Sequence, residues 1–151
     1  MTPLFLTFIE KLQAFSQISS NRIVFEINEL ENVDNVQNLR EIVLHLKKIG
    51  FQIALDDIGK SVMTFERLFE LEPDYIKLDQ YFSYNLLNSP KKQRMIKLLL
   101  DYCSGENINI ILEGVEKEEN FKVAKSLGIP FAQGYFFGKP DSLFKISNKD
   151  R

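Results

Sequence analysis

The carboxylate and amide side chains that end five apolar segments of this sequence are typical of a metal site. The segments are Phe25-Glu26-Ile27-Asn28-Glu29, Ala54-Leu55-Asp56-Asp57, Ile76-Lys77-Leu78-Asp79, Leu112-Glu113-Gly114-Val115-Glu116 and Phe131-Ala132-Gln133-Gly134-Tyr135. When parallel strands alternate with helices, the carboxyl ends of the strands meet at one face. We therefore expect these side chains, distant in sequence, to converge in one polar pocket.

The candidate metal-ligand atoms in these segments are almost all oxygens. Glu26, Asp56, Asp57 and Glu113 supply carboxylates, whereas the whole chain has one histidine and one cysteine. This inventory favours Mg²⁺ or Mn²⁺ over zinc. The adjacent carboxylates at 56 and 57 would repel each other in a dry pocket unless a cation or a lysine compensates them. Taken alone, the pair is equally consistent with a turn that caps the next helix.

Lys77, within an apolar strand, needs a partner for its ammonium group if it is buried. It could stabilise a phosphate or orient a water molecule, or it could form a structural ion pair with Asp79. Glu113 and Glu116 flank Gly114 in a predicted strand-to-loop turn. There Glu113 could bind metal or activate water, and Glu116 could brace the loop. Alone, the two glutamates would be read as a solvated turn.

The elements that must position these residues follow from hydrophobic spacing. Apolar residues at intervals of three and four predict helices over residues 3–17, 34–49, 62–71, 90–103 and 118–127. Asp34 and Gln37 are placed as a capping pair, and Gly50 and Gly128 as helix ends. In the fourth helix we expect Met95, Leu98, Leu99 and Tyr102 to form the apolar stripe. The order is one helix, then repeated strand and helix, which predicts a parallel sheet with right-handed crossovers, either open or part of a (β/α) barrel.

Composition excludes several classes of protein. The chain has 151 residues, 44% of them hydrophobic and 13 of them Phe, which is enough for one domain with a sizeable core. Its 19 basic and 21 acidic residues predict no general binding to a nucleic-acid polymer or an anionic membrane. We expect no membrane segment and no secretory signal, and hence a cytoplasmic protein. The single cysteine, Cys103, is expected to be a packing residue, and His45 a surface residue.

Five short motifs resemble those of EAL-domain cyclic di-GMP phosphodiesterases. They are Glu26-Ile27-Asn28-Glu29, Asp56-Asp57-Ile58-Gly59, Lys77-Leu78-Asp79, Glu113-Gly114-Val115-Glu116 and the segment from Gln133 to Pro140. The family patterns are E-[IL]-T-E, D-D-F-G-T-G, K-[IL]-D, E-G-V-E and Q-G-[YF]-x-[FY]-x-[KR]-P. All five occur here in the same order, and the resemblance covers about residues 3–140.

The resemblance implies a modified TIM-like barrel that holds two Mg²⁺ or Mn²⁺ ions and linearises cyclic di-GMP to pGpG. It implies metal-ligand roles for Glu26, Asp56 and Asp57, contact of Lys77 with water or phosphate, and metal binding or water activation by Glu113. Glu29 would steady the loop after Asp57. Gln133 would complete the pocket, and Asp79 and Glu116 are expected to contact the substrate.

The chain has no E-A-L or E-x-L motif on an opening strand and no V-N-[LI]-S strand. One glutamate and one asparagine of the family's metal shell are therefore absent. Asn28 replaces the motif threonine, and Ile58-Gly59-Lys60-Ser61 replaces F-G-T-G. We expect a truncated EAL-type domain over residues 1–143 and a polar tail over 144–151.

A complete barrel needs about 200 residues or more. The expected fold is therefore a partial TIM-like α/β barrel of about five mainly parallel strands, whose open edges call for a homodimer or an additional chain. We expect weak or no phosphodiesterase activity from the isolated chain. The alternatives are a non-catalytic cyclic di-GMP receptor and a protein-interaction scaffold.

Overall fold

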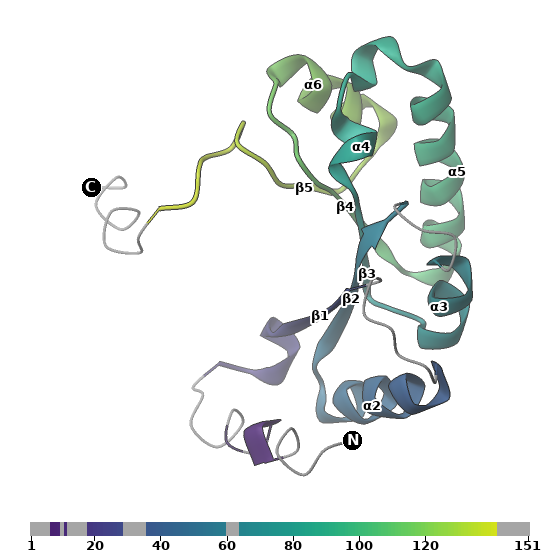
Figure 1. Ribbon diagram of the computed structural model, residues 1–151, viewed down its shortest axis with the longest axis vertical. Helices are drawn as coiled ribbons and strands as arrows, with labels where there is room; N and C mark the ends of the chain where they lie inside the picture. Colours follow the sequence, from purple (N-terminus) through teal and green to yellow (C-terminus); the bar gives the residue numbers. More distant parts are fainter. Residues whose placement is uncertain (1–6, 10, 12–17, 29–35, 60–63, 142–151) are drawn as a thin grey trace.

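A five-stranded parallel sheet organises the chain (Figure 1). The computed structural model describes residues 7–9, 11, 18–28, 36–59 and 64–141. The strands are β1 (Val24–Asn28), β2 (Gln52–Ile58), β3 (Tyr75–Leu78), β4 (Asn109–Leu112) and β5 (Phe131–Ala132). Each strand pairs in parallel with the next one in sequence. The predicted partial barrel is confirmed, because the sheet curves into an open arc (Figure 1).

The helices connect successive strands and cover the convex side of the arc (Figure 1). They are α2 (Val36–Ile49), α3 (Thr64–Leu71), α4 (Gln80–Ser83), α5 (Pro90–Glu106) and α6 (Glu118–Leu127), with short 3₁₀ turns η1 (Ser20–Arg22) and η2 (Leu86–Asn88). Of the helix expected over residues 3–17, the described residues 7–9 and 11 are helical. Asp34 of the expected capping pair, and the first residues of the helix predicted over 62–71, lie outside the described residues.

The hydrophobic core lies between the sheet and these helices. Alternate strand residues point outward into it, and Ile53, Ile76, Leu78, Ile110 and Leu112 are at most 1% exposed. Because strand side chains alternate between faces, the intervening residues point to the concave side, which carries the polar groups. Core packing thus fixes the register that aligns the functional side chains.

Glycine ends α2 and α6 as predicted. Gly50 and Gly128 adopt φ of 99° and 92°, a left-handed conformation that glycine adopts without steric penalty. The expected end of α5 near Cys103 and Gly105 is wrong: the helix continues to Glu106 and is closed by Asn107 at φ 58°. Asparagine is the commonest alternative to glycine in this position.

The predicted apolar stripe of α5 is also wrong. The residues that α5 buries are Ile96, Leu99 and Cys103, whereas Met95 is 46% exposed and Leu98 65% exposed. Of the expected stripe, Leu99 is buried in the core and Tyr102 packs against it. The expectations for Cys103, which is 1% exposed, and for His45, which is exposed, are confirmed.

The sheet is open at both edges within the described residues. β1 and β5 are its two outermost strands and pair only with β2 and β4 there. On the concave face, Val24 of β1 is 41% exposed and Phe131 of β5 is 48% exposed. Among the helices that the structure describes, none combines the length and the apolar character needed to cross a membrane.

Candidate metal centre

Lys77 lies at the centre of the polar side of the sheet. Its Nζ atom lies 3.1 Å from Glu26 Oε2, 3.0 Å from Asp56 Oδ1 and 2.9 Å from Glu113 Oε1. The Lys77 side chain is 7% exposed, while that of Glu26 is 55% exposed. The acids come from β1, from β2 and from the end of β4, so the lysine of β3 joins four neighbouring strands. The suggested ion pair with Asp79 is wrong, because the ion pairs of Lys77 are made with these three acids.

A bulge brings Asp56 and Asp57 to the same pocket. Leu55 pairs with Ile76 and Ile58 pairs with Leu78, so β2 has one more residue than β3 over this stretch. Consecutive residues of a regular strand would point to opposite faces. Asp57 instead adopts φ 61°, and its backbone N–H donates to Asp56 Oδ1 at 2.9 Å. The bulge thereby turns two consecutive carboxylates toward one site.

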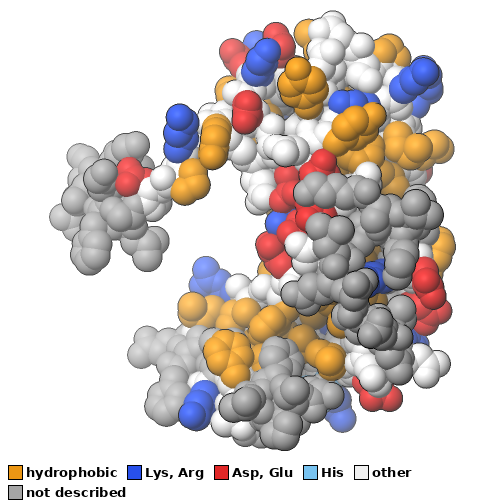
Figure 2. Space-filling view, viewed as in Figure 1, with side chains coloured by type: hydrophobic (Ala, Val, Ile, Leu, Met, Phe, Trp, Pro, Cys, Tyr) orange, Lys and Arg blue, Asp and Glu red, His pale blue; other side chains and the backbone are white. Residues whose placement is uncertain are grey.

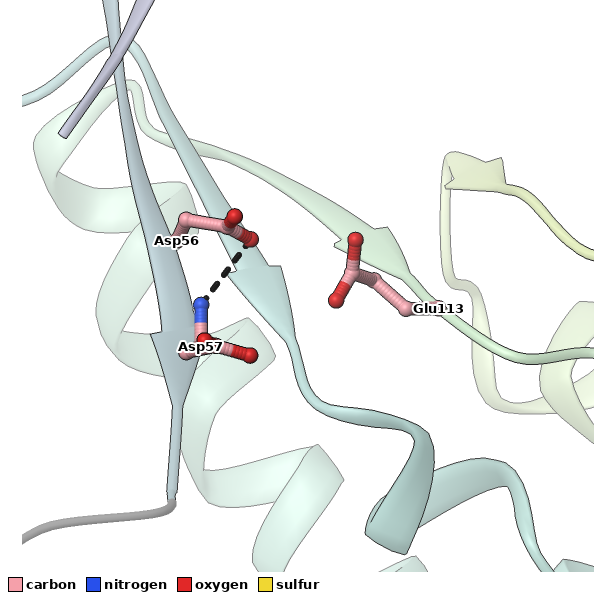
Figure 3. Close-up of side chains that lie close together, drawn as sticks. All are labelled: Asp56, Asp57 and Glu113. Carbon is pink, nitrogen blue, oxygen red and sulfur yellow. Dashed lines mark hydrogen bonds between the residues drawn. The ribbon is translucent and has the colours of Figure 1, made fainter. Parts of the chain in front are cut away.

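Glu113 completes a group of three carboxylates. One carboxylate oxygen from each of Asp56, Asp57 and Glu113 lies within 4.8 Å of the others. Figure 3 shows the three side chains converging, two from β2 and one from the end of β4. Oxygen ligands at this spacing suit a hard divalent cation. The chemistry of the described residues therefore fits the Mg²⁺ or Mn²⁺ that the sequence predicts.

Gln133 holds Glu113 from the β5 side, because its side-chain Nε2 donates to Glu113 Oε1. The adjacent turn needs Gly134: a Cβ there would lie 2.2 Å from the carbonyl oxygen of Val115, and φ is 153°. Val115 N–H in turn donates to the Gln133 carbonyl at 3.0 Å. The glycine lets two loops pack backbone to backbone, which places the amide beside the carboxylate.

The ionisation of the site is coupled. Burial raises the pKa of Glu113, the hydrogen bond and charge of Lys77 oppose this rise, and the charges of Asp56 and Asp57 add to it. Burial lowers the pKa of Lys77, but hydrogen bonds to Glu113, Asp56 and Glu26 outweigh it, so that its pKa lies above the usual value. Lys77 is therefore a permanent cation at neutral pH.

Asp79 and Glu116 line a cavity of about 650 Å³, which Gly114, the residue after Glu113, also lines. Asp79 also caps α4, because its Oδ1 accepts from the backbone N–H of Tyr81 at 2.8 Å. The same cavity is lined by Tyr81, Tyr84 and Lys117, which sequence reasoning missed. Asp79 as an N-cap was the available signal for the four-residue helix that carries Tyr81.

Eight of the nine site residues predicted from the sequence lie in the described part of the chain. Six of them, Glu26, Asp56, Asp57, Lys77, Glu113 and Gln133, form one connected cluster through the contacts above. Asp79 and Glu116 lie in the adjoining cavity. Glu29, predicted to steady the loop after Asp57, lies outside the described residues.

The order of these motifs and their convergence agree with a comparison against known families. The EAL domain model matches residues 1–140. The chain belongs to the EAL domain family. Among curated relatives of this EAL-domain chain, the cyclic di-GMP phosphodiesterase PdeB of Shewanella oneidensis is 35% identical over 136 residues, which cover 90% of this chain and 16% of PdeB.

Solved EAL structures share the fold. A standalone EAL protein from Vibrio cholerae, in its cyclic di-GMP-bound form, is 31% identical with a TM-score of 0.84, and the match covers 93% of this chain and 59% of that one. BlrP1 of Klebsiella pneumoniae, in a calcium and cyclic di-GMP complex, is 26% identical with a TM-score of 0.80, over 89% of this chain and 34% of BlrP1. The chain thus spans less than a fifth of PdeB and less than two thirds of either structure. The BlrP1 structure thus holds a divalent cation together with cyclic di-GMP.

Proposed function

We propose that this chain forms part of a metal-dependent phosphodiesterase site that takes cyclic di-GMP and, in its complete form, hydrolyses it to pGpG. The observation that carries the proposal is the buried Lys77 held by Glu26, Asp56 and Glu113, with Asp57 turned into the same pocket. The names of PdeB and of the V. cholerae structure support the choice of substrate.

Glu26, Asp56 and Asp57, together with Glu113, are the residues that would hold Mg²⁺ or Mn²⁺. Such a cation, when bound, supplies Lewis-acid stabilisation of the phosphate and a more acidic water. Lys77, a fixed positive charge, holds a phosphate oxygen or the attacking water in place. Glu113, whose pKa burial raises, is suited to accept a proton from that water. Gln133 keeps the Glu113 carboxylate oriented.

The cavity lined by Asp79 and Glu116 is the proposed seat for the remainder of the nucleotide. These two residues offer carboxylate acceptors to the N–H groups of a base. Glu29 keeps its proposed role of steadying the loop after Asp57. We propose that the domain extends over residues 1–143 and that residues 144–151 form a tail beyond it.

The isolated chain is proposed to turn over cyclic di-GMP weakly or not at all. The glutamate and the asparagine of the family's first two motifs are missing from its 151 residues, and β1 leaves the concave face open beside Glu26. A homodimer or an additional chain that covers the open edges would complete the barrel. We place the protein in the cytoplasm, where its lone cysteine needs no partner.

Binding without hydrolysis is the second candidate function. It is favoured by the internal compensation of charge at the site: the Lys77 ammonium group contacts three carboxylates, so the pocket does not require a metal in order to be stable. A receptor of this kind would bind cyclic di-GMP equally well in the presence of a chelator.

Calorimetric titration of the chain with cyclic di-GMP, with Mg²⁺, with Mn²⁺ and with a chelator, followed by chromatography for pGpG, tests both functions. We expect metal-dependent binding with little pGpG. The Asp57→Asn variant should lose the metal dependence, whereas the matched Asp101→Asn change on the outer helix α5 should not. Chelator-insensitive binding without pGpG would establish the receptor, and no binding under any condition would refute both functions and leave the interaction scaffold.

A further inference from the structure

The short helix α4 contacts the segments that carry both halves of the carboxylate group. Acidic side chains gather at the inner wall of the arc (Figure 2). Asp56 and Asp57 of β2 form one half of the group, and Glu113, just after β4, forms the other. The two halves face each other across β3 (Figure 3). Because α4 begins directly after β3, with Asp79 as its N-cap, it is placed where it can reach both.

Ser83 joins α4 to the turn that carries Glu113. Ser83 is 1% exposed, and its Oγ atom lies 2.8 Å from the carbonyl oxygen of Gly114 and 3.0 Å from that of Gln80. The hydroxyl has one proton to donate, which it shares between the turn and the helix. Gly114 permits this close approach, since a Cβ there would lie 2.4 Å from Gln80 Cβ. The position of Glu113, the residue before Gly114, is therefore tied to α4.

Phe82 joins the same helix to the segment that follows the bulge of β2. Its ring packs against Gly59, two residues after Asp57, where a Cβ would lie 2.5 Å from Phe82 Cε2. Phe82 is 9% exposed and belongs to the hydrophobic core. The backbone adds a second contact, because the Asp79 N–H donates to the Ile58 carbonyl at 3.2 Å. The helix thus also supports the aspartate half of the group.

The first turn of α5 fixes α4 in turn. Lys92 Nζ donates to the backbone carbonyls of Tyr81 and Tyr84, the latter at 2.7 Å, and it lies 4.1 Å from the centre of the Tyr81 ring. Gln93 Nε2 donates to the carbonyl of Leu86, just beyond α4, at 2.9 Å. With these contacts, the short helix has little freedom to move relative to the strands.

We propose that α4 is a spacer that sets the distance between the two halves of the carboxylate group, with Ser83 and Phe82 as its positioning residues. The proposal rests on the metal centre of the proposed function. It concerns geometry, because neither side chain carries a charge. Mg²⁺ requires near-ideal octahedral geometry, whereas Ca²⁺ accepts longer and more variable ligand distances. Loosening the spacer should therefore weaken Mg²⁺ binding more than Ca²⁺ binding.

Calorimetric titration of the chain with Mg²⁺ and, separately, with Ca²⁺ tests the role of Ser83. Ser83→Ala should lower the Mg²⁺ affinity about tenfold, as loss of a group that supports a metal ligand does, and the Ca²⁺ affinity by about twofold or less. Ser126→Ala is the matched control. Its Oγ also donates to the carbonyl three residues earlier, that of Val123 at 2.8 Å, but it lies on α6, and neither affinity should change. Equal losses for both cations in Ser83→Ala, or an unchanged Mg²⁺ affinity, would overturn the proposal.

Phe82→Leu tests whether α4 acts as one unit. This change leaves space beside Gly59 and should also lower the Mg²⁺ affinity more than the Ca²⁺ affinity. Because breaking either contact releases the same spacer, the double variant Phe82→Leu, Ser83→Ala should lose less Mg²⁺ affinity than the product of the two single losses. Losses that multiply would show two independent contacts and refute the spacer.

The parent chain separates this inference from the proposed function. A parent that binds neither cation would refute the metal centre, and the inference with it. A parent that binds both, with a preference that neither variant alters, would refute the inference alone. Circular dichroism checks the fold of each variant, and Phe82→Leu takes the place of Ser83→Ala if the latter does not fold.

Discussion

Replacing Lys77 with methionine keeps most of the side-chain volume and removes the charge at the centre of the site. The ammonium group lies within 3.1 Å of carboxylates from Glu26, Asp56 and Glu113, so its loss leaves those carboxylates facing one another. Glu113 and Asp56 side chains are only 16% and 21% exposed, and they cannot regain full hydration. Glu26, at 55% exposed, can rehydrate and adds little to the cost.

Breaking a buried ion pair costs about 3–5 kcal/mol, and the partial exposure of these acids places the expected loss at the lower end, about 3 kcal/mol. With a urea m-value of about 2 kcal/mol/M, the midpoint of unfolding should fall by about 1.5 M. Urea titration at pH 8 followed by circular dichroism measures it. Lys122→Met is the matched control, because Lys122 is 71% exposed in its pair with Glu118 and its loss should cost about 0.5 kcal/mol or less.

Two further measurements separate charge from packing. The double variant Lys77→Met, Glu113→Gln removes one of the stranded carboxylates and should recover part of the loss. Mn²⁺ should raise the thermal midpoint of Lys77→Met by more than that of the parent chain, because the metal replaces a missing positive charge. If Lys77→Met and Lys122→Met unfold at the same urea concentration, the buried ion-pair reasoning is wrong.

Three other outcomes are expected. Asp57→Gly should reduce Mn²⁺ affinity at least about tenfold in calorimetry. The fold should stay intact, because glycine accepts the φ of 61° at this position. An unchanged affinity would exclude Asp57 as a ligand. Gly134→Ala should lower the free energy of unfolding by about 2 kcal/mol or more in urea titration, since its Cβ would lie 2.2 Å from the Val115 carbonyl oxygen, and a stable variant would contradict this contact. Burial raises the pKa of Cys103 from 9.0 to about 11, so the neutral thiol favours folding below pH 9. This contribution to the free energy of unfolding is lost as the pH rises from 9 to 11. Relative to Cys103→Ala, the loss is at most about 2.7 kcal/mol. Parallel urea titrations of the two chains at pH 8 and pH 10.5 measure that difference, and equal pH dependence would refute it.

The architecture was predictable because local signals and periodicity agreed over most of the chain. The helix predicted over residues 118–127 matches α6, and the strand-end acids identified the face at which the site assembles. The stripe on α5 was predicted wrongly for a physical reason. Met95, Leu98 and Tyr102 repeat with the same spacing as Ile96, Leu99 and Cys103, so the helix has two apolar stripes. Only packing against the sheet decides which one is buried.

The site was predictable in its residues and less so in its contacts. Residues two apart in a strand point to the same side, so a strand that ran through Asp79 would have placed its side chain beside that of Lys77. Parallel register instead brought acids of β1, β2 and β4 to the lysine, and α4 engaged Asp79 as its cap. The bulge at Asp57 was not predictable, because a non-glycine residue at positive φ leaves no mark in the sequence.

The pairing of each strand with its immediate successor also bears on how the chain acquires its structure. Among the described strands, sheet contacts form only between consecutive strands. Each pairing therefore closes a connection of one strand-helix unit and not one that spans the whole chain. The arc can therefore grow one strand at a time as the polypeptide leaves the ribosome. Glu26, on the first strand, is synthesised long before Gln133, just beyond the last strand. The polar cluster that joins them is completed only when the whole arc has formed, which makes the state of Lys77 a sensitive reporter of the final step in folding.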